Sequence, residues 1–320
     1  MFFKFLELIK KNLLVTIFIG MGFGLIIGNN FDVDYFKNFI IPLTFLLVYP
    51  MMVTLKFHTL IEKSNKKLQF TTQLINFILF PAIALTLGFL FFNDDPYLQL
   101  GLLLIALLPT SGMTISWTVM AKGNINAAIK MVIIGLLLGG ILAPIYITVF
   151  LGSEVDVDAT GIFVQILLVV FAPLLLGFLT QKFLIKKYTK EVFHKSIKPR
   201  FPLFSTLGIV LMIFVAMSLR AEVLIDRPAI LLEILAPLII MYALFFAISV
   251  GAARLFFNRS NGIALVNGTL IRNLSLALAI VLSTFDRAGD AGLMIAIAYV
   301  LQVQIAAWNV KISKYIFKKE

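Results

Sequence analysis

The sequence predicts an all-α polytopic membrane protein, with ten transmembrane helices arranged as two inverted five-helix repeats and two of the helices broken. Three observations carry this prediction. Hydrophobic residues make up 61% of the 320 residues, charged residues 13%, and the mean hydropathy is +1.02, far above that of soluble domains. The apolar residues form long runs. Two of these runs, half a chain apart, are interrupted by clusters of polar residues with proline or glycine.

Ten apolar runs are long enough to cross a bilayer, since one span needs about 20 residues. The loops between them are short, so residues 1–320 are expected to form a single integral membrane domain. The runs lie at roughly residues 13–28, 36–55, 70–92, 98–121, 125–151, 161–180, 201–219, 229–250, 262–284 and 293–310.

Basic residues gather in alternate loops, which predicts the orientation of the chain. Most of the 27 Lys and Arg residues lie in the two termini and the even-numbered loops; the opposite loops hold Lys37, Arg220, Arg227 and Arg287 among many carboxylates. By the positive-inside rule both termini are cytoplasmic, in the plasma (cell inner) membrane. The most basic stretch, residues 181–200, is interpreted as a topology signal against anionic headgroups rather than a regulatory site.

The two halves of the chain repeat one layout. The first and sixth spans begin near residues 13 and 161, the interrupted fourth and ninth near 98 and 262, and the fifth and tenth near 125 and 293. The repeats therefore cover roughly residues 1–152 and 161–320. Because each repeat has an odd number of spans, the second must insert upside down, which gives the inverted repeats typical of secondary transporters.

The fourth span is interrupted by Pro109-Thr-Ser-Gly-Met113. Pro109 has no N–H and Gly112 adds backbone freedom, so carbonyls and amides near residues 105–113 lose their helical partners. In hydrocarbon such groups must be satisfied by protein, water or a ligand. The alternative is a simple proline kink with hydroxyls bonded to the preceding turn. The candidate binding residues in this break are Pro109, Thr110, Ser111, Gly112, Thr114 and Ser116.

The ninth span is interrupted by Asn267-Gly-Thr-Leu-Ile-Arg-Asn-Leu-Ser275, near its centre. Arg272 is the only arginine predicted at mid-membrane depth, where its insertion costs about 2.5 to 3.5 kcal/mol on translocon scales, so it needs a partner. Its planar guanidinium suits two oxygens at once. Glu233, the one carboxylate in any span, is expected near the outer surface, so the partner is an anion or the carbonyls freed by the breaks. The candidate binding residues in this break are Asn267, Thr269, Arg272, Asn273 and Ser275.

Other polar residues lie within the predicted spans. Gln73 and Asn76 are three residues apart on one face of the third span and are expected to line the same cavity. Lys130 is interpreted as snorkelling to the cytoplasmic surface. Gln302 and Gln304, in the tenth span, either contact a substrate or pack between helices.

Composition excludes several kinds of site. The chain has no cysteine, so it has no disulfide, thiolate metal site or thiol nucleophile. His58 and His194 fall in predicted loops with no second ligand at a suitable spacing, so no metal centre is expected. Because nearly every carboxylate is in a loop and no Gly-x-x-x-x-Gly-Lys motif occurs, we expect neither an enzyme nor an ATPase.

Four stretches resemble a known family. They are Pro109-Thr-Ser-Gly-Met-Thr-Ile-Ser-Trp117 with Lys122-Gly123-Asn124, Ala143-Pro144, Tyr49-Pro50-Met51-Met52, and Asn273-Leu-Ser-Leu-Ala-Leu-Ala279. They are similar to the bile acid:sodium symporter superfamily, and most closely to its arsenite-efflux permease branch. The resemblance implies a core domain of helices 3–5 and 8–10, a panel domain of helices 1–2 and 6–7, and broken helices 4 and 9 that cross at mid-membrane. It also implies transport by alternating access at this crossing.

Two departures from that family bear on the substrate and the coupling ion. Thr110 stands where arsenite permeases typically have a cysteine, so the soft thiolate suited to trivalent arsenic is missing. Ser275 stands where both branches typically have a glutamate, which helps to bind sodium in the symporters. The loss of an acid and the gain of Arg272 argue against sodium bound in the family manner. Any sodium ligands are expected among Thr110, Ser111, Thr114, Asn267 and Ser275.

Three functions remain. The first is a secondary active transporter of a small anion or metalloid oxyanion, driven by an ion gradient or the membrane potential. The second is a sodium-coupled symporter of bile-acid-like organic anions, and the third is a passive channel or a non-transporting membrane sensor. The expected partners are a small anionic substrate and the lipid bilayer, without nucleic acid. No cofactor is expected besides Na+ or H+ as a coupling ion.

Overall fold

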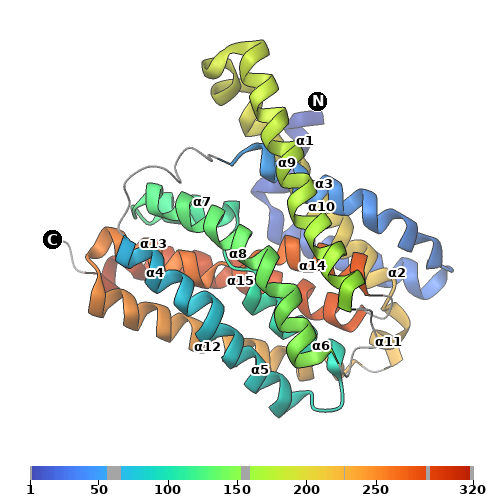
Figure 1. The fold of residues 1–320 in the computed structure, drawn as a ribbon. Coiled ribbons are helices and arrows are strands. Elements are labelled where there is room, and N and C mark those ends of the chain that lie inside the picture. The colour runs from blue at the N-terminus through green and yellow to red at the C-terminus, as the bar shows by residue number, and fades with distance from the viewer. Residues whose placement is uncertain (1, 56–65, 153–158, 227, 286–288, 318–320) are drawn as a thin grey trace. The chain divides into compact units, whose positions relative to one another are not determined.

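The computed structural model describes residues 2–55, 66–152, 159–226, 228–285 and 289–317, and these residues are almost entirely helical (Figure 1). His58, Arg227 and Arg287, which were placed in loops from the sequence, lie outside the described residues. The α-helices are α1 Phe2–Lys11, α2 Leu13–Asn30, α3 Ile40–Val53, α4 Lys66–Leu74, α5 Phe80–Phe91, α6 Pro96–Leu107, α7 Gly112–Met120, α8 Ile125–Leu151, α9 Ala159–Val192, α10 Phe201–Ser218, α11 Ala221–Asp226, α12 Ile230–Phe256, α13 Arg259–Leu270, α14 Leu274–Thr284 and α15 Gly289–Ile316. A π-helix, Ile75–Leu79, joins α4 to α5.

Every predicted span is helical apart from the two breaks and a few residues at span ends, and the long apolar helices make the chain a polytopic membrane protein. Among the described residues, seven helical stretches are long and apolar enough to cross a membrane by length and composition, and one of them, Phe163–Ser218, includes most of α9 and all of α10. The fourth predicted span is divided into α6 and α7, and the ninth into α13 and α14. The sequence did not predict α1, α11 or the extension of α9 to Val192.

The chain divides into two compact units. Unit 1 comprises Met1–Leu55, Val157–Leu231 and Ser275–Ala296, and unit 2 comprises Lys56–Asp156, Leu232–Leu274 and Ile297–Glu320. The division cuts α15 after Ala296 and separates α13, in unit 2, from α14, in unit 1.

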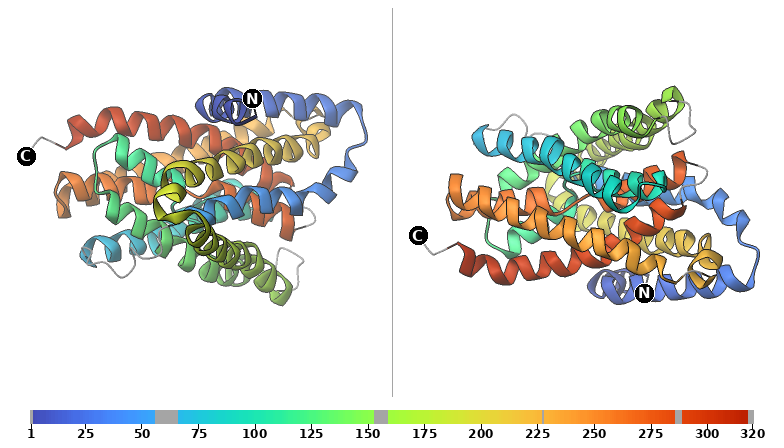
Figure 2. Two further views of the ribbon diagram at one scale, coloured as in Figure 1. Left: turned by 90° about the horizontal axis from the view of Figure 1, so that it is seen from above. Right: turned by 90° about the horizontal axis from the view of Figure 1, so that it is seen from below.

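Unit 1 is held together by close packing of apolar helices. Gly20, Gly24 and Gly28, four residues apart on α2, all face α10, and a Cβ on Gly24 would lie 2.7 Å from the Phe214 carbonyl oxygen. Small residues at this spacing let two helix backbones approach closely. Figure 2 shows α2 and α10 side by side, and α3 packs between α10 and α9.

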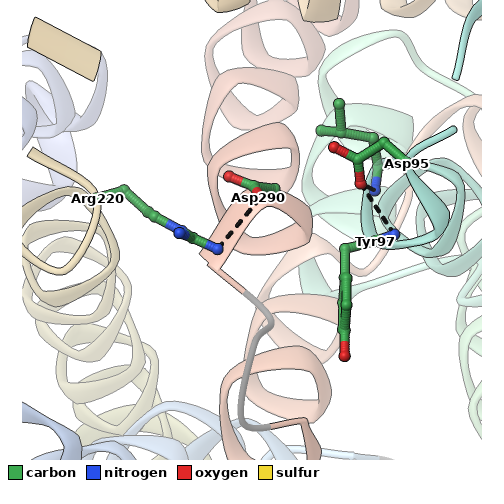
Figure 3. A network of polar contacts seen from close by, with 5 residues as sticks. Asp95, Tyr97, Arg220 and Asp290 are labelled. Carbon is green, nitrogen blue, oxygen red and sulfur yellow. Dashed lines mark hydrogen bonds and ion pairs between the residues drawn. The ribbon is translucent and has the colours of Figure 1, made fainter. Parts of the chain in front are cut away.

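A partly buried ion pair joins two segments of unit 1 that are far apart in the sequence. Arg220, which follows α10, places its Nη2 3.1 Å from Oδ2 of Asp290, in the first turn of α15 (Figure 3). Asp290 also adds negative charge at the N-terminus of α15, which the helix dipole favours.

Unit 2 is built around α13, which packs against α4, α7 and α8, while α5 packs against α6. Two of its helices begin at residues whose side chains accept hydrogen bonds from the first N–H groups of the helix. The Asp95 carboxylate accepts the N–H groups of Tyr97 and Leu98 at 3.1 and 3.0 Å and so begins α6 (Figure 3). Asn124 begins α8 by accepting the Ala127 N–H, and its amide donates to the Asn261 side chain at 2.8 Å.

Candidate functional site

The two helix breaks pair with each other, backbone to backbone. The Thr110 N–H donates to the Ile271 carbonyl at 2.9 Å, and the Asn273 N–H donates to the Leu108 carbonyl at 2.7 Å. Pro109 and Arg272 are the opposed residues of this short antiparallel bridge. They form its non-hydrogen-bonded pair, in which neither residue donates its own N–H across the bridge. A proline is therefore tolerated at 109 without losing a bond to the partner segment.

The breaks leave a defined set of helix carbonyls without their usual partners. In α6 the Ile105 carbonyl would accept from residue 109, which is proline, and the Ala106 carbonyl from Thr110, whose N–H is used in the bridge. In α13 the Thr269 carbonyl would accept from Asn273, whose N–H is also used in the bridge. These carbonyls must be satisfied by another group.

The guanidinium of Arg272 satisfies all three of these carbonyls. Its Nε donates to the Ile105 carbonyl at 3.0 Å, its Nη2 to the Ala106 carbonyl, and its Nη1 to the Thr269 carbonyl at 2.8 Å. Nη1 also donates to Oδ1 of Asn76 at 2.7 Å. The side chain is 1% exposed. Of the two kinds of partner that the sequence allowed for Arg272, the structure supplies the carbonyls freed by the breaks.

Aromatic rings lie beside the same guanidinium. Its Cζ is 5.6 Å from the ring centre of Phe80 and 5.8 Å from that of Phe245. The two rings are stacked on each other, with centres 3.7 Å apart. The guanidinium lies at nearly equal distances from the two stacked rings, beside the edge of the stack, where the rings exclude water from it.

Gln302 binds the backbone of Arg272. Its Oε1 accepts the Arg272 N–H at 2.7 Å, and its Nε2 donates to the Arg272 carbonyl at 3.1 Å. The carboxamide thus serves both backbone groups that the bridge leaves unpaired. Oε1 also accepts the Tyr242 hydroxyl at 3.1 Å. Because α12 and α15 each supply one of these side chains, both helices fix the position of the break.

Asn76 connects the third predicted span to the same break. Its Nδ2 donates to the Gly268 carbonyl at 3.0 Å, while its Oδ1 accepts from Arg272. Asn76 lies in the π-helix, a wider turn that is frequently found at functional sites. The contact between Asn76 and Arg272 was not predicted from the sequence, which placed Asn76 in a shared cavity with Gln73.

Thr110 has a left-handed backbone, with φ of 60°. This is costly for a β-branched residue, by about 1 to 3 kcal/mol, and such strain collects at functional sites. Its hydroxyl donates to the Pro109 carbonyl at 2.7 Å and faces α8 at Gly135, where a Cβ would lie 2.6 Å from it. Gly135 is thus required for the close approach of α8 to the first break.

Ser111 and Thr114 form the cap of α7. Ser111 Oγ accepts the Met113 N–H at 3.2 Å, and Thr114 Oγ1 accepts the Ser111 N–H at 3.1 Å, which is a reciprocal capping box. Gly112 is the first residue of α7. Ser111 and Thr114 are buried, whereas Ser116 is exposed on α7 and lies away from the cap.

A second polar cluster links α13 to α7 and α15. The Asn267 amide donates to Thr118 Oγ1 at 3.3 Å, and the Asn309 amide donates to Asn267 Oδ1 at 2.9 Å. Thr269 lies on another side of α13, with its hydroxyl 2.7 Å from that of Ser249 on α12. All five side chains are buried.

Only some of the predicted binding residues lie at the paired breaks. Pro109, Thr110, Thr269, Arg272 and Asn273 lie at the bridge or bond to it. Gln73, also predicted, is partly buried as a residue, and both polar atoms of its carboxamide are buried without a hydrogen-bond partner among the described residues; Ser275 belongs to unit 1.

Five polar side chains described at the site were not among the predicted binding residues. For Gln302, the sequence signal was a polar residue within a predicted span, which left substrate contact and packing between helices as alternatives. Thr118, Tyr242, Ser249 and Asn309 are isolated polar positions in apolar helices, and no local pattern distinguishes them from surface positions of the same helices.

The site carries a positive charge that no buried acid offsets. Among the residues that the structure describes, Arg272 is the only buried charged side chain, and no Asp or Glu is buried. The site can therefore attract an anion, but most donors of the guanidinium are already bonded to the protein.

Residues 41–227 of the chain match the Sodium Bile acid symporter family. Arsenical-resistance protein Acr3 of Alkaliphilus metalliredigens is 24% identical over 288 residues, which cover 85% of this chain and 80% of that protein. Arsenical-resistance protein Acr3 of Corynebacterium glutamicum is 24% identical over 305 residues, covering 88% and 82%. Sodium/bile acid cotransporter 7 of Danio rerio is 29% identical over 182 residues, covering 56% and 51%.

Proposed function

The chain belongs to the Sodium Bile acid symporter family and is a multi-pass membrane transporter of a small molecule rather than an enzyme; we propose that it is a secondary active transporter of a small anion or metalloid oxyanion. The solute would bind beside the paired breaks of α6–α7 and α13–α14 and be exposed to each side of the membrane in turn.

One observation carries the choice of an anion. Arg272 is buried at the paired breaks without a buried carboxylate among the described residues. A buried charge of this kind is costly unless other groups offset it. The carbonyl oxygens carry partial negative charges that offset part of the positive charge of Arg272, and an anionic solute would add a full negative charge.

The guanidinium would act on the solute mainly through its charge. Four hydrogen bonds already join it to the protein, out of the five N–H groups of an arginine. This leaves one N–H, on Nη2, for a direct contact, so a bidentate grip on two oxygens is not the binding mode we propose. With no cysteine in the chain, capture of trivalent arsenic by a thiolate is excluded as well.

Alternating access would arise from movement between two bodies. We propose ten transmembrane helices in two inverted repeats, with both termini cytoplasmic in the cell's inner membrane. The division into two units supports a moving-body mechanism, because helices predicted as panel fall in unit 1 and α4 to α8 fall in unit 2. The assignment of α14 to unit 1 differs from the core domain that the resemblance implies.

Flux into proteoliposomes tests the proposal. Arsenite, arsenate, acetate, methanesulfonate and taurocholate are supplied in turn, with an imposed membrane potential, and with sodium or choline as the cation. We expect concentrative, saturable uptake of at least one small anion in choline. Uptake of taurocholate alone, and only in sodium, would instead establish the sodium-coupled organic-anion symporter. Equilibration without accumulation would indicate a channel and contradict the proposal.

A further inference from the structure

We propose that the guanidinium of Arg272 is a tethered cation that permanently occupies an oxygen cage at the paired breaks. The transporter would then work without a free cation at this position. The claim about coupling rests on the proposed transport function, whereas the cage is a property of the folded protein alone.

The cage consists of four oxygen atoms from three segments of unit 2. They are the carbonyl oxygens of Ile105, Ala106 and Thr269 and Oδ1 of Asn76, all hydrogen-bonded to the one guanidinium. A set of neutral oxygens converging on one point is the donor set that hard cations prefer. Here an amino-acid side chain supplies the cation.

Helix dipoles strengthen the preference for positive charge. Ile105 and Ala106 lie in the last turn of α6, and Thr269 in the last turn of α13. The C-terminal end of a helix carries about half a negative elementary charge, borne by carbonyls of this kind. Two such ends directed at one guanidinium offset part of its charge and help to hold a buried arginine that has no carboxylate partner among the described residues.

The neighbouring side chains fix this occupant in place. Gln302 bonds both the N–H and the carbonyl of Arg272, and Phe80 and Phe245 lie against the guanidinium. The side chain is thus held at its backbone and at its head. An occupant fixed in this way cannot leave and return during transport, as a coupling ion must.

The inference predicts that the cage accepts a free cation once the tether is removed. In Arg272→Ala the four oxygens face a cavity of guanidinium size. We expect this variant to melt at a lower temperature than wild type. Millimolar guanidinium, sodium or potassium chloride should then raise its melting temperature in a saturable way, with guanidinium most effective, because each binds only the folded cage. The wild-type protein should respond to none of these salts beyond the response to choline chloride.

Arg259→Ala is the matched control. Arg259 Nη1 also donates to a main-chain carbonyl, that of Phe317, at 2.7 Å, but away from the breaks. Its variant should gain no cation response, and millimolar urea, a denaturant without charge, should rescue neither variant. A folded Arg272→Ala protein that no cation stabilises more than choline would overturn the cage. If that variant does not fold, Arg272→Lys keeps the charge and should remain unresponsive to sodium; a saturable sodium response in it would overturn the inference.

Measurements of flux test separately whether Arg272 takes the place of a coupling ion. In proteoliposomes at constant ionic strength, the initial flux of the transported anion should be equal in sodium and in choline for wild type. In Arg272→Ala it should depend on the free cation. Sodium-dependent wild-type flux would refute the tethered-cation role. An absence of any anion flux with a normal cation response in the melting experiment would refute the proposed function alone.

Discussion

The Gln302 carboxamide bonds both backbone polar groups of Arg272, at 2.7 Å to its N–H and 3.1 Å to its carbonyl. It occupies the position that a further β-strand would take beside the bridge between Pro109 and Arg272. One side chain of α15 therefore completes the pairing of a break that lies 30 residues earlier in the chain. The position of the guanidinium depends on this contact, because Gln302 fixes the backbone from which it extends.

Replacing Gln302 with leucine should destabilise the protein by about 2 to 5 kcal/mol, since it leaves two buried backbone groups unpaired. Reversible unfolding in mixed detergent micelles measures this loss. Gln304→Leu is the control, because Gln304 is exposed on the same helix of unit 2 and should be near neutral. Equal stability of the two variants would contradict the role given to Gln302.

Gly135→Ala should destabilise the protein by about 1 to 3 kcal/mol, the usual cost of overpacking. The added Cβ would lie 2.6 Å from Thr110 Oγ1, whereas a Cβ on Gly251 of α12 meets no atom within 4 Å, so Gly251→Ala serves as the control. Thr110→Gly removes the obstructing hydroxyl and relieves the left-handed backbone. The double variant should therefore lose less stability than the sum of the two single variants. Strict additivity would argue against this contact.

The cluster of Thr118, Asn267 and Asn309 should respond unequally to leucine substitutions. Asn267 bonds both other residues, so Asn267→Leu should cost about 2 to 4 kcal/mol by leaving buried groups unpaired. Asn309 lies at the end of the cluster, and its Oδ1 is buried without a bond among the described residues. Asn309→Leu removes that unpaired oxygen but also leaves Asn267 Oδ1 without its bond; because the two effects oppose each other, the net cost should be about 1 kcal/mol or less. Thermal unfolding ranks the two variants, and the reverse order would contradict the bonding pattern.

Asn76→Asp tests the charge of Arg272 without altering the arginine. A carboxylate in place of Oδ1 would offset the guanidinium charge at a distance of 2.7 Å. We expect anion flux to fall by about tenfold or more, since a loss of about 1.4 kcal/mol already changes a rate tenfold. Asn76→Leu removes the same contact but leaves the charge, and per folded molecule it should retain more flux than the aspartate variant. Wild-type flux in Asn76→Asp would show that the charge does not act on the solute.

The sequence by itself determined the class of the protein and the position of its long apolar helices. Bilayer thickness and the absence of water in hydrocarbon leave few ways to arrange apolar runs of this length, so composition and hydropathy were sufficient. Local chemistry also predicted the two breaks, within residues 109–113 and 267–275, and in the structure they lie at residues 108–111 and 271–273. Pro109 cannot donate a hydrogen bond, and a charged residue in an apolar run requires a nearby polar group.

The partners of those breaks were decided only by the tertiary structure. Local sequence shows that the Ile105 carbonyl loses its donor, but Arg272, 167 positions later, replaces that donor. Gln302 and Asn76 come from two further segments, and their roles depend on which helix faces the break. The sequence left Arg272 with two kinds of partner, an anion or freed carbonyls. Packing chose the carbonyls, because it brought the ends of α6 and α13 within reach of one guanidinium.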